Sequence, residues 1–136
     1  MAIVGSCLCG AVRYEVEDSP GDAGSCHCSM CRKAHGAAYG TYASVEPGKF
    51  RWLSGEERVG FYESSPGGGR MFCRTCGSTL GGFENEQITS VTLGTIDGDP
   101  GIRPRSHIFV GSKAPWHEIA DDLPQFEEWP PGDDWA

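Results

Sequence analysis

The residues of this sequence that could do chemistry are seven cysteines, which fall into three groups: Cys7-x-Cys9, Cys26-x-Cys28-x2-Cys31 and Cys73-x2-Cys76. A Cys-x2-Cys pair in a tight turn directs both sulfurs at one ion, and a Cys-x-Cys pair can do so from an extended turn. Gly77, directly after Cys76, permits the positive φ of such a turn. Four thiolates held as a tetrahedron suit Zn²⁺. The two outer pairs therefore predict a closed zinc site made of Cys7, Cys9, Cys73 and Cys76.

The remaining three cysteines, Cys26, Cys28 and Cys31, lie close together in the sequence. Three protein ligands with one free position are typical of a zinc ion that binds water or substrate. We therefore predict two zinc ions per chain, one in a closed structural site and one in an open site.

The spacing leaves several alternatives open. His35 or His107 could supply a fourth ligand and close the second site as well. Cys31 could instead join the pair Cys73 and Cys76. An iron–sulfur cluster also accepts thiolates, although Cys-x-Cys pairs are less usual for it. Buried free thiols or disulfides would need no metal at all.

Short strands joined by tight turns must position these cysteines. The chain contains 20 glycines and 9 prolines, which favour turns over long helices. Alternating apolar residues between turn signals predict strands over 11–16, 38–45, 50–53, 59–62, 70–73, 78–83, 88–96 and 106–110. We expect a flexible loop over 64–69, short helices over 30–37 and 114–120, and an irregular tail laid over the sheet from Lys113. The predicted class is mainly β.

Composition and charge narrow the class of protein. A length of 136 residues predicts one domain. No run approaches the ~20 apolar residues of a membrane span, and the segment before Cys9 is too short for a signal peptide. The net charge is −8, and there is no basic run that could bind phosphates. We therefore expect a cytoplasmic protein that binds neither nucleic acid nor membranes, in which clustered cysteines bind metal or react more often than they form disulfides.

Four segments carry a resemblance to a known family: residues 5–14, 26–33, 72–78 and 107–113, which read GSCLCGAVRY, CHCSMCRK, FCRTCGS and HIFVGSK. They resemble the family of glutathione-dependent formaldehyde-activating enzymes, which shares its zinc domain with centromere protein V. The resemblance implies a single zinc-binding domain over residues 5–130. The proline-rich sequence of the tail separately predicts fraying over 131–136. It also implies a β-tent fold, in which small antiparallel sheets are organised around zinc-binding knuckles.

The resemblance also implies ligands and an activity. A structural zinc would lie on Cys7, Cys9, Cys73 and Cys76, and a second zinc on Cys26, Cys28 and Cys31. The implied reaction joins glutathione to formaldehyde as S-hydroxymethylglutathione, which is a carbon–sulfur lyase reaction run in reverse. Zinc coordination deprotonates a thiol. We expect the open site to bind the glutathione sulfur rather than to polarise the aldehyde, because three thiolates leave the ion a poor electrophile.

A site for glutathione, which carries two carboxylates, needs local cations or backbone N–H groups. Arg32 and Lys33 directly follow Cys31 and are predicted to bind these carboxylates. The glycine-rich loop over 66–70 could offer its amides to an anion. Weaker candidates are Arg13, Arg70, Arg103 and Arg105.

Histidines are the predicted proton carriers of the site. His35 and His107 are the candidates for this catalytic role, because histidine changes charge near neutral pH. His27, between two predicted ligands, is expected to face solvent. Tyr39 and Trp116 are expected to belong to the core.

Two classes of function follow. The first is a zinc-dependent enzyme that handles a small thiol and an aldehyde, with glutathione as the thiol that the resemblance implies. The second is a binding module in which two zinc ions only stabilise a small fold, or a carrier that holds glutathione or another thiol without accelerating chemistry. Fold does not decide between them.

Overall fold

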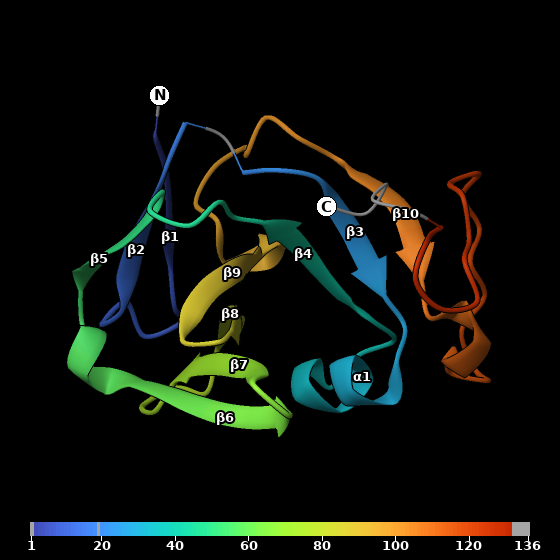
Figure 1. The fold of residues 1–136 in the computed structure, drawn as a ribbon, viewed down its shortest axis with the longest axis horizontal. Coiled ribbons are helices and arrows are strands. Elements are labelled where there is room, and N and C mark those ends of the chain that lie inside the picture. Colours follow the sequence, from blue (N-terminus) through green and yellow to red (C-terminus); the bar gives the residue numbers. More distant parts are fainter. Residues whose placement is uncertain (1, 19, 132–136) are drawn as a thin grey trace.

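The computed structural model describes residues 2–18 and 20–131 of the chain as two β-sheets and one short α-helix (Figure 1). The smaller sheet has the order β1–β2–β5, formed by Ala2–Ser6, Arg13–Glu17 and Phe50–Ser54. The larger sheet has the order β10–β3–β4–β9–β8–β7–β6, formed by Pro104–Ile108, Ala23–Cys26, Gly40–Ser44, Gln87–Thr92, Thr79–Glu84, Gly68–Cys73 and Val59–Ser65. The helix α1 spans Ser29–His35, and 3-10 turns cover Glu56–Arg58, Leu93–Thr95 and Val110–Ser112.

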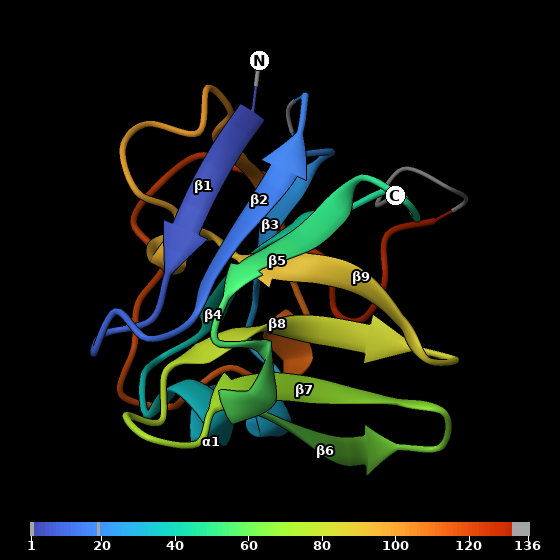
Figure 2. The same ribbon diagram turned by 90° about the vertical axis from the view of Figure 1, so that its left-hand side faces the viewer.

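The prediction of a mainly β protein is confirmed. Hairpins joining β6 to β9 form one end of the large sheet, as Figure 2 shows. The sequence did not indicate β1 and β3, because neither segment shows a run of alternating apolar residues. β3 pairs with β10 in parallel, whereas every other strand pair among the described residues is antiparallel.

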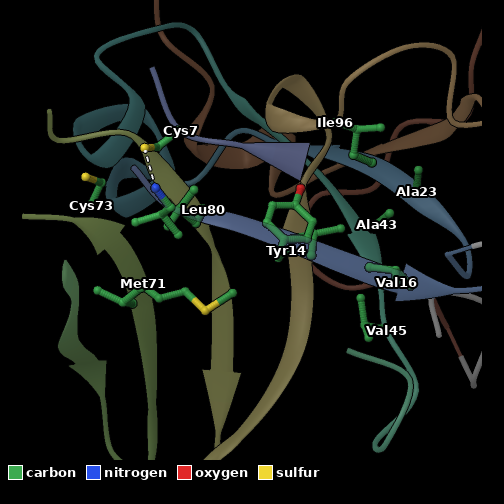
Figure 3. Close-up of a cluster of buried hydrophobic side chains, with 13 residues drawn as sticks. Cys7, Tyr14, Val16, Ala23, Ala43, Val45, Met71, Cys73, Leu80 and Ile96 are labelled. Carbon is green, nitrogen blue, oxygen red and sulfur yellow. Dashed lines mark hydrogen bonds between the residues drawn. The ribbon is translucent and has the colours of Figure 1, made fainter. Parts of the chain in front are cut away.

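One buried cluster joins the two sheets. Figure 3 shows Tyr14 of β2 beside Leu80 of β8, and Val16 of β2 beside Val45. These side chains belong to the same buried cluster as Met71 of β7, and Tyr14, Val16, Met71 and Leu80 are each at most 1% exposed. Along β2, Tyr14 and Val16 alternate with charged side chains, because successive side chains of a strand point to opposite faces. The aromatic ring of Tyr14 stacks on Phe50 of β5, with ring centroids 5.2 Å apart. Burial of these apolar side chains is the main source of the stability of the fold.

Two predicted segments differ in the structure. No helix forms over 114–120. A single turn closes there by a hydrogen bond from His117 N–H to the carbonyl of Ala114. Lys113 Nζ donates a hydrogen bond to the carbonyl of His117. The loop predicted over 64–69 is shorter than expected, because β6 extends to Ser65 and β7 begins at Gly68.

The C-terminal segment lies outside β10 at the edge of the large sheet (Figure 1). It is irregular, as predicted, and it is bonded to β10 through Phe126 N–H and the carbonyl of Pro124, both of which pair with the backbone of His107 at 2.9 Å. Residues 132–136, to which most of the predicted frayed tail belongs, lie outside the described residues. No helix in the described part of the chain has the length and apolar character needed to cross a membrane.

Candidate metal centres and the adjoining cavity

Two separate groups of cysteines could each hold a metal ion. The first group has four members, and its sulfur atoms all lie within 4.8 Å of one another: Cys7, Cys9, Cys73 and Cys76. A tetrahedral site with Zn–S bonds near 2.3 Å places neighbouring sulfurs about 3.8 Å apart. The Sγ of Cys9 lies 3.6 Å from that of Cys7 and 3.9 Å from that of Cys73. The donor set and its spacing therefore fit zinc.

Local turns present these four sulfurs. Gly10 N–H donates to the carbonyl of Cys7, and Gly77 N–H donates to the carbonyl of Cys73. Gly77 has a φ of 81°, a left-handed conformation that glycine adopts without steric cost, as the sequence predicted. The Ser78 hydroxyl, 3.3 Å from Cys76 Sγ, lowers the pKa of that thiol to about 5. A sulfur held as a thiolate is the form that binds metal.

The second group has three members, Cys26, Cys28 and Cys31, whose sulfurs also lie within 4.8 Å of one another. Cys26 ends β3, Cys28 caps the N-terminus of α1 with its Sγ 3.3 Å from the N–H of Cys31, and Cys31 is the buried residue of the helix. No histidine of the described chain lies within this group of ligand atoms. Cys31 thus belongs with its sequence neighbours and not with Cys73 and Cys76.

The three thiols cannot all ionise together without a compensating cation. Hydrogen bonds with Cys28 and Cys31, followed by burial, raise the pKa of the Cys26 thiol. The hydrogen bonds that Cys28 accepts from the other two thiols lower its own pKa. Crowded thiols with opposite pKa shifts share protons, and a bound divalent cation would displace those protons. This arrangement also fits zinc with three protein ligands.

A cavity of about 420 Å³ adjoins the three-cysteine group, and Cys26 and Cys31 lie in its wall. A row of residues that pair directly across four strands lines it: Arg70, Gly82, Ser90 and Ser44. These side chains share one face of the large sheet, because cross-strand partners point the same way. Of the four-cysteine group, none lines this cavity. The two groups therefore differ in access to a small molecule.

Arg70 and Tyr42 lie beside Cys31 at the cavity, and His35 contacts Tyr42 from behind. Arg70 donates from its two terminal nitrogens to the Tyr42 hydroxyl at 2.7 Å and to Cys31 Sγ at 3.5 Å. His35 Nε2 lies 2.5 Å from the same hydroxyl. Burial and then the charge of Cys31 raise the pKa of Tyr42, whereas burial and then the charge of Arg70 lower the pKa of His35. At neutral pH the cavity therefore contains a neutral phenol beside a fixed cation.

The predicted carboxylate ligands lie elsewhere. Arg32 and Lys33 extend from α1 and do not line the cavity, whereas Arg70, which we ranked as a weaker candidate, does. The Nε of Arg32 is buried and has no hydrogen-bond partner in the described part of the chain. A role for Arg32 and Lys33 in binding carboxylates stays a prediction.

The predicted proton carriers also lie outside the cavity wall. His35 reaches it only through Tyr42, and His107 is 3% exposed with both ring nitrogens bonded. Their catalytic roles stay predictions.

Two further expectations were wrong. His27 does not face solvent but is fully buried, because β10 and the C-terminal segment lie against it. Trp116 is not in the core, since 70% of its side chain is exposed. Tyr39 is half-buried, with its ring centroid 4.8 Å from that of His27.

Comparison with known proteins adds independent findings. The profile of the family described as glutathione-dependent formaldehyde-activating enzyme matches residues 2–112. A protein of Halomonas elongata that carries the family's name is 35% identical over 131 residues, which cover 88% of this chain and 82% of the relative. An uncharacterised lyase of Schizosaccharomyces pombe is 32% identical over 76 residues, covering 56% of this chain and 53% of that protein.

A solved structure shows the same fold. The crystal structure of a Rhodobacter sphaeroides protein superposes with a TM-score of 0.60 at 28% sequence identity. The match covers 90% of this chain and 98% of the other.

Proposed function

The chain belongs to the family of glutathione-dependent formaldehyde-activating enzymes, and from that premise we propose that it is a zinc-dependent carbon–sulfur lyase that joins a thiol to formaldehyde or a related aldehyde. Glutathione is the proposed thiol. The observation that supports this proposal is the position of the three-cysteine group at a cavity of about 420 Å³, within the range of small-molecule sites.

The seven cysteines have two proposed roles. Cys7, Cys9, Cys73 and Cys76 would hold a structural zinc, and Cys26, Cys28 and Cys31 would hold a second zinc with one position free. Bound zinc would supply a binding site for the incoming sulfur and lower the pKa of that thiol.

The proposed reaction balances without an oxidant or reductant. A sulfur lone pair attacks the carbonyl carbon and forms the carbon–sulfur bond. The carbonyl π electrons move to oxygen. The proton lost by the thiol is transferred to that oxygen, which gives the hydroxymethyl group of the product. The reverse steps return thiol and aldehyde, as in a lyase.

The residues of the cavity would orient the reactants. The Arg70 guanidinium places a positive charge beside Cys31, where it attracts a negatively charged sulfur. The Tyr42 hydroxyl lines the same wall and can hydrogen-bond to a substrate oxygen. Gly82 pairs with Arg70 across the sheet and also lines the cavity. His35, which bonds to the Tyr42 hydroxyl, is the proposed proton carrier, and Arg32 and Lys33 are the proposed carboxylate ligands.

Metal content and ligand binding test this function together. Elemental analysis of protein purified without chelator should give two zinc ions per chain. A count of one would contradict the open site, and iron would contradict the whole scheme. Calorimetric titration should show glutathione binding far more tightly than S-methylglutathione, because the thioether cannot form a thiolate. Equal binding of the two, or none at millimolar concentration, rules out docking through sulfur.

Catalysis itself needs a rate measurement. Glutathione and formaldehyde combine spontaneously, so exchange between ¹³C-formaldehyde and its adduct should be followed by NMR with and without protein. The wild-type protein should accelerate the exchange, and Cys28→Ser should not. Binding without acceleration would instead support a thiol carrier, and the absence of both would support a zinc-stabilised binding module. A cytoplasmic location and the absence of nucleic-acid and membrane partners stay predictions.

A further inference from the structure

A hydrogen-bonded row of three side chains lies outside the cavity and is not used by the proposed reaction. His27 is fully buried, and its Nε2 lies 2.9 Å from Nδ1 of His107. The Nε2 of His107 lies 3.0 and 3.1 Å from the two carboxylate oxygens of Asp121. His27 stands between two members of the three-cysteine group, so the row ends inside the loop that carries the sulfurs.

When each ring carries a single proton, the carboxylate at one end sets which nitrogen of each ring holds it. A carboxylate only accepts hydrogen bonds, so His107 carries its proton on Nε2 and presents a lone pair at Nδ1. His27 must then donate from Nε2, and its own Nδ1 carries no proton. That Nδ1 is buried and has no hydrogen-bond partner within the described residues. The bond to His107 is therefore the one hydrogen bond that the structure gives the His27 ring.

The backbone supports the same connection. The N–H of His27 donates to the carbonyl of Ile108 at 2.9 Å. His107 in turn makes two backbone hydrogen bonds to the C-terminal segment. Within that segment, Leu123 N–H donates to the Asp121 carboxylate Oδ1 at 3.0 Å. The loop before α1 is thus fixed to β10 by main chain and side chain, and β10 is fixed to the C-terminal segment.

An anchored His27 determines where its neighbours point. Side chains at positions i and i+2 of an extended chain lie on one side, and the side chain between them lies on the other. β3 ends at Cys26, and Cys28 has the extended dihedral angles φ −65° and ψ 158°. Holding the His27 ring in the interior therefore directs Cys26 and Cys28 together to the opposite side, where Cys31 lies.

We propose that His27, His107 and Asp121 are positioning residues for the three-cysteine group, with Asp121 fixing the orientation of His27 through His107. This role rests on the proposed function only in that it takes zinc as the metal. The row acts through the loop and touches neither substrate nor metal. Partners that orient metal ligands from behind commonly change metal affinity 10- to 100-fold when they are removed. Asp121 is two hydrogen bonds from the loop, so we expect an effect of about tenfold, at the lower end of that range.

The test compares two adjacent aspartates. Asp121→Ala removes the acceptor of the row, and Asp122→Ala makes the same change in charge and size at an exposed neighbour. In Asp121→Ala, one of two zinc ions should transfer to a chromophoric chelator about tenfold faster than in wild type, and the other at an unchanged rate. The Co²⁺-substituted protein should also show a shifted sulfur-to-metal absorption band. Equal release rates and spectra for the two variants would overturn the proposal.

Two further variants exclude a general loosening of the C-terminal segment. His27→Phe keeps a buried ring but cannot hydrogen-bond, so it should release zinc as fast as Asp121→Ala. Wild-type release from His27→Phe contradicts the proposal. Asp121→Asn keeps an oxygen acceptor and should restore much of the slow release, whereas a merely structural need for the carboxylate charge predicts no rescue.

Readouts that need no second metal separate this proposal from the proposed function. Nitrogen NMR of the histidines should show His107 protonated on Nε2 in the wild type, and a proton on Nδ1 would overturn the proposal. Alkylation of the three-cysteine group should be faster in Asp121→Ala than in Asp122→Ala, and equal rates count against it. A wild-type content of one zinc contradicts the proposed function and leaves both of these outcomes measurable.

Discussion

The guanidinium of Arg70 lies 3.5 Å from the Sγ of Cys31, although the two residues are 39 positions apart in the sequence. Arg70 belongs to β7 and Cys31 to α1, and the large sheet brings the two elements to the same cavity. The same guanidinium also donates a hydrogen bond to the Tyr42 hydroxyl and so fixes its position. Arg70 therefore holds Tyr42 in place and places a positive charge beside the cysteine sulfurs. This contact makes Arg70 the first residue to test.

Arg70→Gln should weaken the binding of glutathione without removing either metal. A hydrogen bond to a charged group contributes about 1.5–3 kcal/mol, which corresponds to roughly a 10- to 100-fold change in affinity. Calorimetric titration of the metal-loaded protein measures this change. Arg13→Gln, on an exposed position of β2 away from the cavity, is the matched control and should bind as wild type does. Equal affinities of the two variants would exclude a role for Arg70 in binding.

The two cysteine groups should differ in their effect on folding. Cys73 is fully buried within the core cluster, so Cys73→Ser should remove the structural metal and give unfolded or insoluble protein. Cys28 lies at the start of α1 outside that cluster, and Cys28→Ser should leave a folded chain with one metal fewer. Circular dichroism and elemental analysis of both variants check this division. Loss of the folded signal in both would refute it.

Gly5→Ala should destabilise the junction of the two sheets. A Cβ on Gly5 would lie 2.2 Å from Cζ of Tyr14, whose ring is fully buried, so the ring would have to shift within the core. Overpacking of this kind costs about 1–3 kcal/mol. Urea unfolding gives the difference in free energy. Gly94→Ala is the control, because its Cβ would meet nothing within 4 Å and its φ is not positive, and it should change stability little.

Stability should fall in alkaline solution because of Tyr14. Burial raises the pKa of Tyr14 to about 12 from its usual value of 10.0. A hydrogen bond with Thr95 lowers the pKa and offsets part of this effect. The unfolded chain therefore loses this proton at lower pH than the folded chain. The stabilisation is complete below pH 10 and is lost as the pH rises toward 12, by an amount of about 3 kcal/mol.

Urea unfolding at pH 9 and at pH 11.5 measures this loss. In Tyr14→Phe the decrease between the two pH values should be smaller, although Tyr42, whose pKa is also raised, still contributes. An unchanged decrease in Tyr14→Phe would show that other groups cause it.

The sequence by itself was sufficient for the features that depend on neighbouring residues. The Cys-x-Cys and Cys-x2-Cys spacings, the glycine after Cys76 and the alternation around Tyr14 are local patterns, and each is found in the structure where the sequence predicts it. The family resemblance has the same origin, because it rests on four short segments that carry the cysteines and His107.

Which distant residues meet was decided by the tertiary structure. Arg32 and Lys33 follow Cys31 in sequence, but successive residues of a helix point about 100° apart, so adjacency along α1 does not place them at the cavity. Arg70 reaches Cys31 because it belongs to β7 of the large sheet and lines the cavity into which Cys31 also faces. His27 is buried because β10 pairs in parallel with β3 and brings His107 against it, a long-range pairing that no local pattern indicates. Local spacing therefore specified the cysteine groups, and sheet topology determined which charges and hydrogen bonds surround them.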